Sequence, residues 1–258
     1  MTIEALKNGF QEAKQAPRDE NCDTHGPYVS NHIFMHVWSA CPVCTADKKA
    51  TRQREEDEKE AFSRLRAWKQ KLGNAGIPER FHARTLDSYI ASNAGQRSAL
   101  AFAKEFAEGF AGEKSGRCAI FCGKPGTGKT HLSVGIGLHA MTLNKMVLFT
   151  TVQRMVRRVK DSWKKESDES ESEAIGLFVQ PDLLIIDEIG VQFGSEYEKN
   201  LMFDILNERY ENSMPSLLLS NLTATEVKAF LGERVFDRLR EDGGKCIPFD
   251  WQSHRGQE

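Results

Sequence analysis

The stretch of sequence that decides the fold runs from Cys118 to Thr130 and reads CAIFCGKPGTGKT. Its last eight residues, GKPGTGKT, match the pattern G-x-x-x-x-G-K-[ST] in full. An apolar run, CAIFC, precedes the motif, and a helical pattern, HLSVGIGLHAM, follows it. A strand, a glycine-rich loop and a helix in this order form a phosphate-binding loop. The sequence therefore predicts a nucleotide-binding α/β domain.

Each part of this loop has an expected role toward ATP and Mg²⁺. Glycines let the backbone wrap closely around phosphate oxygens, and the helix N-terminus adds a partial positive charge. Lys129 is expected to reach the β- and γ-phosphates, and the Thr130 hydroxyl to ligate Mg²⁺. The predicted nucleotide-binding residues are those of the motif: Gly123, Lys124, Pro125, Gly126, Thr127, Gly128, Lys129 and Thr130.

Two carboxylates follow a second apolar run in the sequence LLIIDE, residues 183–188. A buried strand that ends in this way carries its charges at its tip, so Asp187 is predicted to hold the Mg²⁺ shell. Glu188 is predicted to polarise the attacking water, as in P-loop hydrolases with an additional strand. The separation from Lys129 leaves room for one intervening strand and its crossover helices.

A third apolar run ends at Asn221. Asn221 is a candidate for positioning the water or sensing the γ-phosphate from the tip of the neighbouring strand. The alternative is a turn residue or a helix N-cap, since asparagine after a strand commonly takes these places.

Short apolar runs alternate with helical patterns along this part of the chain, which predicts a parallel sheet flanked by helices. Phe102, Phe106 and Phe110 recur every four residues, so we expect them to form one helical stripe in the core. The expected strands are Cys118–Cys122, Met146–Thr151, Leu183–Asp187, Ser216–Ser220 and Lys245–Phe249.

The N-terminal region contains two short-spaced pairs of metal-ligand residues, Cys22-x2-His25 and Cys41-x2-Cys44. Two tight turns would bring these four side chains around one tetrahedral Zn²⁺, with His32 or His36 as alternative fourth ligands. An unligated, reduced set is the other interpretation. Because this region is too short to bury a sufficient apolar core by itself, the metal would supply its folding free energy. With four protein ligands, the zinc is expected to be structural.

The changes in composition predict three segments. Residues 1–47 form the zinc-binding module, which begins with an amphipathic helix over residues 1–21 that ends near Pro17. Residues 48–76 form a charged connecting helix, with Phe62, Leu65, Trp68 and Leu72 on one face, and residues 77–258 form the ATPase domain. The last boundary is expected near Ala75, where glycines interrupt the helical pattern.

Charge and hydropathy exclude several classes of protein. The 258 residues contain 35 Lys and Arg against 37 Asp and Glu, so contact with nucleic acid would need a local basic patch. The N-terminus lacks the apolar core of a signal peptide, and no 18-residue apolar run occurs, so we expect no membrane partner and a cytoplasmic location. In the cytoplasm, cysteines serve as thiols or metal ligands rather than disulfides.

Four segments, GKPGTGKTHL, LLIIDEIGVQFGSEYEK, LGERVFDRLRE and FDWQSHR, resemble the DnaC family of bacterial replicative-helicase loaders, which are AAA+ ATPases. The resemblance covers roughly residues 77–255. It implies an AAA+ core with an extra strand between the P-loop strand and the Asp187 strand. It also implies action on a hexameric DnaB-type helicase near single-stranded DNA, with several copies assembling in an ATP-dependent way. The N-terminal region is similar to zinc-bearing ends of other loader and phage replication proteins.

The same resemblance implies roles for three residues. Asn221 falls on the sensor-1 asparagine, and Arg238 in GERVFDR falls on the arginine finger, with Arg234 as the nearest alternative. Arg255 in SHR falls on the sensor-2 arginine.

The leading hypothesis is therefore an ATP-dependent helicase loader or a related replication protein. The ATPase helper of an insertion-sequence transposase shares the same core and is the nearest alternative. A nucleotide-gated adaptor that does not depend on hydrolysis is the alternative from another class, and Glu188 argues against it. Co-purification with the helicase, or with a transposase or duplex DNA, would distinguish the first two.

Overall fold

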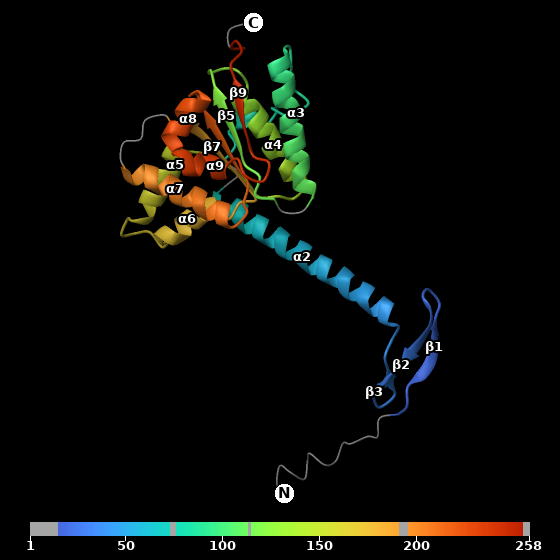
Figure 1. Cartoon of the computed structure of the whole chain (residues 1–258). Helices are drawn as coiled ribbons and strands as arrows, with labels where there is room; N and C mark the ends of the chain where they lie inside the picture. Colours follow the sequence, from blue (N-terminus) through green and yellow to red (C-terminus); the bar gives the residue numbers. More distant parts are fainter. Residues whose placement is uncertain (1–14, 73–75, 113–114, 191–195, 255–258) are drawn as a thin grey trace. The chain divides into compact units, whose positions relative to one another are not determined.

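The structure, a computed structural model, describes residues 15–72, 76–112, 115–190 and 196–254 (Figure 1). The chain divides into two compact units, residues 1–63 and 64–258. The predicted domain limits at 47/48 and 76/77 stay predictions, and the boundary expected near Ala75 falls outside the described residues.

Two short antiparallel hairpins form the beginning of the first unit. β1 (Arg18–Cys22) pairs with β2 (Gly26–Ser30), and β3 (His32–Phe34) pairs with β4 (Val37–Trp38). The turn between β1 and β2 closes at Gly26, where φ is 77°. Glycine adopts this left-handed conformation without strain, which explains its place directly after the turn.

The prediction of a helix over residues 1–21 is wrong for residues 15–21, the part of this segment that the structure describes. Residues 1–14 lie outside that part, but the chain is already a strand from Arg18 onward. Pro17 has no N–H to donate, and the backbone after it finds its partners across the hairpin in β2.

The charged helix α2 (Pro42–Leu72) begins at Pro42 rather than at the predicted residue 48. Proline suits the first helical turn because its missing N–H is one that would find no partner there. Pairs one turn apart, such as Arg52 and Glu56 at 2.9 Å, support the exposed helix. Phe62, one of the four residues of the predicted apolar face, is exposed, and the other three side chains lie outside the described ones.

Five parallel strands form the sheet of the second unit, in the order β6-β7-β8-β5-β9. Each strand begins and ends within two residues of the predicted run. Because β8 lies between β5 and β7, the sheet has the additional strand that the resemblance implied, and the predicted fold class is confirmed. The strands are β5 (Ala119–Gly123), β6 (Val147–Thr151), β7 (Leu183–Ile189), β8 (Ser216–Ser220) and β9 (Lys245–Phe249).

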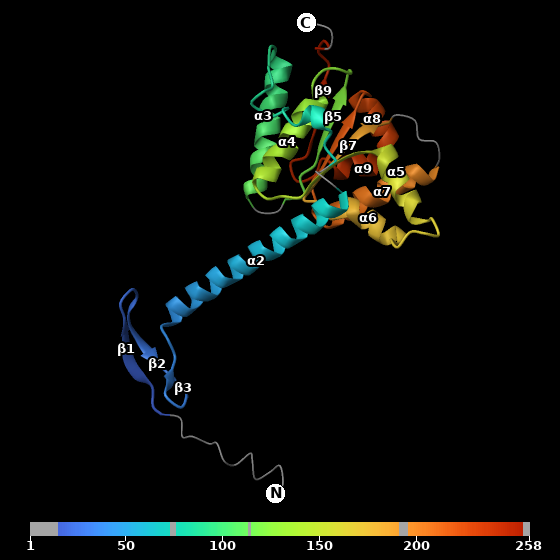
Figure 2. The ribbon, with the colours of Figure 1, turned by 180° about the vertical axis from the view of Figure 1, so that it is seen from behind.

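Helices cover both faces of this sheet. α3 (Ala94–Glu108) and α4 (Lys129–Thr142) lie on one face, and α5 to α9 lie on the other (Figures 1 and 2). Within the described ranges, no helix is both long enough and apolar enough to cross a lipid bilayer. The remaining elements are η1 (Glu79–Phe81), η2 (Gly109–Ala111), α5 (Val152–Ser162), α6 (Glu171–Val179), α7 (Glu196–Glu211), α8 (Ala224–Leu231) and α9 (Glu233–Arg238).

The core lies between the sheet and its two helical layers. Ile120, Leu184 and Leu218, from the adjacent strands β5, β7 and β8, are 0% exposed. Phe102 and Phe106 of the predicted stripe are buried against the sheet, which confirms their place in the core. Each of these side chains contributes about 2 kcal/mol by leaving water.

The carboxyl ends of β5, β7 and β8 meet at one edge of the sheet. The register pairs Cys122 of β5 with Ser220 of β8, and Ser220 also pairs with Ile189 of β7. The loop after β5, the carboxylates of β7 and the residue after β8 therefore share this edge, where open parallel sheets bind their ligands.

Candidate functional site

Three glycines of the P-loop take backbone angles that other residues avoid. The φ angle is 120° at Gly123, 74° at Gly126 and 98° at Gly128. A Cβ at Gly123 would lie 2.5 Å from the carbonyl oxygen of Phe249, and one at Gly128 would lie 2.7 Å from the ring of Tyr89. The path of the loop therefore requires glycine at these positions.

Lys129 begins α4 and is only 7% exposed. Its Nζ donates to the carbonyl oxygens of Gly123 and Lys124, both at 2.7 Å, so the ammonium lies against the loop. Charged phosphate oxygens are stronger acceptors than these carbonyls. This position fits the predicted contact of Lys129 with a triphosphate.

Thr130 and Asp187 come together across 57 positions of sequence: the Thr130 hydroxyl donates to Asp187 Oδ2 at 3.2 Å. A hydroxyl and a carboxylate are oxygen ligands of the kind that Mg²⁺ prefers, so this pair fits the ion. Burial raises the pKa of Asp187, while hydrogen bonds from the Glu188 N–H and the Thr130 hydroxyl oppose that shift. A bound cation would keep the carboxylate ionised.

Glu188 has a left-handed backbone, with φ at 64°, although it is not a glycine. The ladder between β7 and β8 is irregular from Ile186 to Ile189, and the Glu188 N–H donates to Asp187 Oδ1 at 2.7 Å. Strained conformations of this kind cluster at functional sites because they aim side chains that a regular strand would direct elsewhere. Here the irregularity leaves Asp187 partly buried and Glu188 exposed.

A cavity of about 600 Å³ opens at this edge of the sheet. A volume of this size falls in the range of small-molecule sites. Its lining brings together the predicted residues Lys129, Thr130, Asp187, Glu188 and Asn221. Their catalytic and binding roles stay predictions, but these five side chains share one cavity.

Three arginines that the sequence analysis did not single out also line the cavity: Arg80, Arg84 and Arg154. Arg80 belongs to η1, Arg84 follows it, and Arg154 lies in the first turn of α5. A cavity with several cations attracts a polyanion such as a triphosphate. The sequence carried no clear signal for them, because an arginine far from the motif resembles an ordinary surface residue.

Asn221 follows β8 and lies on the cavity wall. The alternative interpretation as a helix N-cap is wrong, because Thr223 caps α8 with a complete capping box. The proposed sensing of the γ-phosphate by Asn221 stays a prediction.

Neither candidate arginine finger is among the described residues that line this cavity. Arg238 Nη1 donates to Asn207 Oδ1 at 2.8 Å, and its guanidinium lies 4.9 Å from the centre of the Tyr210 ring. Arg234, the alternative, is exposed on the same short helix. Arg255, the predicted sensor-2 residue, lies outside the described residues.

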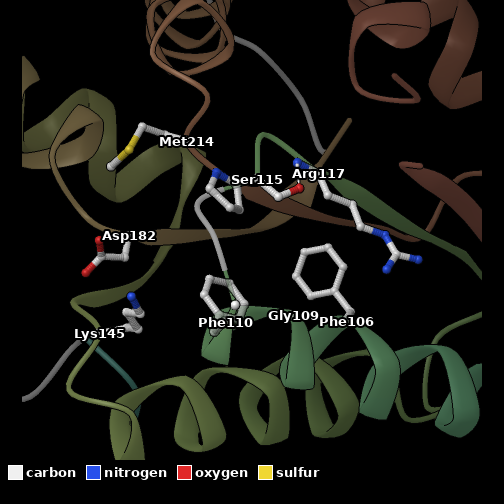
Figure 3. Close-up of a pocket in the computed structure, with 10 residues that line it drawn as sticks. Phe106, Gly109, Phe110, Ser115, Arg117, Lys145, Asp182 and Met214 are labelled. Atoms are coloured by element: carbon white, nitrogen blue, oxygen red, sulfur yellow. Dashed lines mark hydrogen bonds between the residues drawn. The ribbon is translucent and has the colours of Figure 1, made fainter. Parts of the chain in front are cut away.

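A second pocket lies near the start of the strands, because its lining residues Lys145, Asp182 and Pro215 lie one or two residues before β6, β7 and β8. Figure 3 shows the side chains that line it. Its volume is about 150 Å³, and it is lined by the rings of Phe106 and Phe110 together with Lys145 and Asp182. The guanidinium of Arg117, also at its wall, is engaged with Gly243 O and Glu105. The pocket is smaller than most sites for drug-sized ligands, so the cavity at the P-loop is the better nucleotide site.

In the first unit, four predicted metal ligands converge. The ligand atoms of Cys22, His25, Cys41 and Cys44 all lie within 4.8 Å of one another. The Nδ1 atom of His25 is 3.8, 3.8 and 3.3 Å from the sulfurs of Cys22, Cys41 and Cys44. Sulfur atoms about 2.3 Å from a tetrahedral Zn²⁺ lie about 3.8 Å apart, so the donor set fits zinc.

Neighbouring groups complete this site. Backbone N–H groups of Thr24 and His25 lower the pKa of the Cys22 thiol, whereas the hydrogen bond with Cys22 raises the pKa of the Cys44 thiol. A bound cation would favour the thiolate at both positions. Asp47 Oδ2 lies 3.9 Å from His25 Nε2, where it can orient the ring, and the sequence analysis did not single it out. Of the alternative ligands, His32 bonds the Met35 carbonyl instead, and neither His32 nor His36 belongs to the cluster.

Comparison with known proteins agrees with this geometry. The model of the family of IstB-like ATP-binding proteins matches residues 57–242. The replicative helicase loader DnaC of Buchnera aphidicola subsp. Acyrthosiphon pisum is 36% identical over 184 residues, which cover 71% of this chain and 74% of that protein. DnaC of Escherichia coli K12 is 36% identical over 173 residues, or 67% of this chain and 69% of that one.

A solved structure shows the same fold. The crystal structure of the DnaC helicase loader superposes with a TM-score of 0.57 at 23% identity, and the match covers 66% of this chain and 99% of that one. At this identity the likeness concerns the fold alone.

Proposed function

This chain belongs to the family of IstB-like ATP-binding proteins, and we propose that it acts as an ATP-dependent loader or regulator of the replicative DNA helicase. Its AAA+ P-loop fold supports ATPase activity in general. The shared cavity of Lys129, Thr130, Asp187 and Glu188 carries the ATP-dependent part of the proposal. It combines a cation for the phosphates, two oxygen ligands for Mg²⁺ and an exposed carboxylate for the attacking water. The loader part rests on the 36% identity to the DnaC helicase loaders.

Hydrolysis would follow from the positions of these groups. Lys129 and the loop amides orient the triphosphate, and Thr130 and Asp187 hold the cation that neutralises it. Glu188 accepts a proton from water on the γ-phosphate side. Asn221, on the next strand tip, holds that water or the γ-phosphate.

The first unit offers a surface for the replicative helicase, the DnaB-type partner. Five large apolar side chains between residues 29 and 37 are 47–61% exposed. Such a concentration of exposed apolar residues in a small module marks an interaction surface. They are Val29, Ile33, Phe34, Met35 and Val37.

The end of α5 offers features that suit single-stranded DNA. Trp163, directly after this helix, is 51% exposed, and Arg157 and Lys160 on α5 are exposed as well. Aromatic rings stack on bases, and nearby cations attract the phosphate backbone. Lys160 also pairs with Glu198 at 3.2 Å, so Arg157 and the Trp163 ring would be the first contacts of a DNA strand at this place.

Assembly of several copies is the third part of the proposal. Neither Arg234 nor Arg238 is among the described residues that line the chain's own cavity, so we expect either arginine to act on ATP held by a neighbouring copy. We place the protein in the cytoplasm, where bacterial chromosomes are replicated.

A reconstituted loading assay tests the function. The chain is mixed with the replicative helicase of its source organism, single-stranded DNA and either ATP or ADP, and DNA-bound helicase is measured. We expect a helicase complex on gel filtration and loading that depends on ATP and is lost in Lys129→Ala. Binding to a transposase or to duplex DNA, with no helicase complex, would support the transposase-helper alternative. Undiminished loading by a Glu188→Gln variant that cannot hydrolyse ATP would support the nucleotide-gated adaptor.

A further inference from the structure

Two aromatic side chains outside the P-loop and outside the segment LLIIDE converge on one carbonyl oxygen of the P-loop, that of Thr127. The indole Nε1 of Trp251 donates to this oxygen at 2.9 Å. The hydroxyl of Tyr89 donates to the same oxygen at 3.4 Å, a longer and weaker bond. Tyr89 precedes α3 and Trp251 follows β9, so the two donors come from opposite ends of the second unit's sequence.

The backbone after β9 runs beside the same loop. The Lys124 N–H donates to the Phe249 carbonyl at 2.9 Å, and the His254 N–H donates to the Gly126 carbonyl at 3.0 Å. Trp251 lies between these two contacts in sequence. Residues 249–254 therefore contact the loop at three residues, Lys124, Gly126 and Thr127.

Close packing fixes both rings in place. A Cβ at Gly128 would lie 2.7 Å from the Tyr89 ring, and a Cβ at Gly95 would lie 3.0 Å from the Trp251 ring. The Trp251 ring also packs on Phe249, with 4.7 Å between ring centres. Such contacts leave little freedom to either donor.

The geometry of the peptide bond relates these contacts to phosphate binding. In a planar trans peptide the C=O and the N–H point in opposite directions. A donor that holds the Thr127 carbonyl therefore fixes the direction of the Gly128 N–H. In the same way, the bond to the Gly126 carbonyl fixes the Thr127 N–H. A P-loop binds phosphate oxygens through such N–H groups, and its affinity depends on their being oriented in advance.

We propose that Trp251 and Tyr89 are positioning residues, which hold the P-loop peptides in their phosphate-binding orientation through the Thr127 carbonyl. The proposal rests on ATP being the ligand of the P-loop, as the proposed function requires. Neither residue touches the reacting atoms in this role.

The shared acceptor predicts a particular pattern of effects. The Thr127 side chain is 0% exposed, and its carbonyl keeps one donor when the other is removed. We expect Trp251→Phe to weaken binding of an ATP analogue about 5-fold and Tyr89→Phe about 2-fold, in keeping with one hydrogen bond each. The double variant leaves the carbonyl without either donor, so its loss should exceed about 30-fold, more than the product of the two.

The test is titration calorimetry of the full chain with Mg²⁺ and adenylyl imidodiphosphate. Thermal unfolding and steady-state ATPase kinetics of each variant accompany it. Tyr197→Phe is the matched control, because its hydroxyl donates to Glu171 Oε1 at 3.1 Å, outside the cavity lining. We expect KM to follow the change in Kd while kcat stays within about 2-fold of wild type.

Each outcome decides the inference. Affinities of Trp251→Phe and of the double variant equal to wild type would overturn it, as would losses that simply multiply. A lower melting temperature without a change in Kd would show a merely structural role and overturn it too. If the double variant does not fold, Trp251→Phe decides alone. Failure of the wild-type chain to bind the analogue would instead overturn the proposed function.

Discussion

Glu188 combines an exposed carboxylate with a backbone conformation that costs free energy. A left-handed φ of 64° places its Cβ near backbone atoms, at a cost of about 1 kcal/mol or more. The sequence LLIIDE predicted two carboxylates near the carboxyl end of a buried strand, because apolar runs that end in charge are a local feature; β7 continues past them to Ile189. The irregular ladder that separates the two side chains depends on pairing with β8, so it could not be predicted from these six residues.

Strain at this residue can be measured by comparing Glu188→Gly with Glu188→Ala. Elsewhere glycine is the less stable of the two by up to about 1 kcal/mol. At a left-handed position the order reverses, so we expect Glu188→Gly to be the more stable variant by about 1 kcal/mol. Urea unfolding of both proteins gives the difference. Greater stability of the alanine variant would show that φ at this residue is not left-handed in solution.

The roles of Lys129 and Glu188 separate binding from hydrolysis. Lys129→Ala should abolish tight ATP binding, because no other side chain of the P-loop places an ammonium against its carbonyls. Glu188→Gln should bind ATP and hydrolyse it at least about 100-fold more slowly, since only water activation is lost. Equilibrium binding and single-turnover rates of the two variants check this. Wild-type turnover by Glu188→Gln would refute the catalytic assignment.

At the scale of elements, the second unit was predicted more accurately than the first. Strands of the parallel sheet are buried on both faces and read as continuous apolar runs, so their limits were predicted within two residues. β1 has the sequence RDENC and no such pattern; its pairing arises from the turn that brings Cys22 to Gly26. The ligand spacing predicted that Cys22, His25, Cys41 and Cys44 converge, but not the hairpin and helix that carry them.

Metal removal should therefore affect the first unit alone. We expect one zinc per chain, and its chelation to abolish amide protection in β1 and β2, because their core is too small without the metal. ATP affinity should not change. His25→Ala should lose zinc, whereas the matched control His36→Ala, exposed and outside the cluster, should retain it. Zinc analysis and hydrogen exchange check both variants; protein purified without chelator that contains no zinc would contradict the site.

A buried arginine forms hydrogen bonds to several elements of the second unit, near the start of β7 and β8. Arg209 of α7 is 0% exposed, and it donates to Ser216 Oγ and to four backbone carbonyls. Burial lowers its pKa to about 10, so it stays charged at neutral pH. The carbonyls belong to Phe178, Val179, Pro181 and Pro215.

Arg209→Met should destabilise the protein by about 3 kcal/mol or more, because several buried carbonyls lose their donor at once. Arg209→Lys should recover only part of this, since an ammonium cannot match the planar fork. Arg157→Lys, at an exposed position, is the control and should change stability by less than about 0.5 kcal/mol. Urea unfolding measures all three. A small effect of Arg209→Met would show that water replaces the guanidinium.

At the scale of the whole molecule, the described lining of the cavity contains the predicted phosphate and Mg²⁺ ligands but neither candidate arginine finger, Arg234 or Arg238. Arg238 is held by Asn207 and by the Tyr210 ring, whereas Arg234 is exposed. The sequence could rank these two arginines only through resemblance to a family, because a helix such as ERVFDR has no pattern of its own that marks a finger. The contacts on α7 position Arg238 at a defined place on the surface, and Asn207 is too weak a partner to prevent it from moving to a phosphate.

We expect Arg238 to act on ATP held by a neighbouring copy, because a planar, permanently charged donor suits the charge that spreads over the γ-phosphoryl oxygens. Arg238→Ala should bind ATP normally but lose the part of hydrolysis that rises with protein concentration or with helicase. A mixture of Arg238→Ala and Lys129→Ala chains should regain activity, since one copy supplies an intact P-loop and the other an intact arginine. Turnover of the mixture, with co-assembly confirmed by gel filtration, checks this. If the mixture is no more active than either variant, or Arg238→Ala hydrolyses ATP normally at every concentration, the exposed Arg234 becomes the candidate, and the same mixture made with Arg234→Ala tests it.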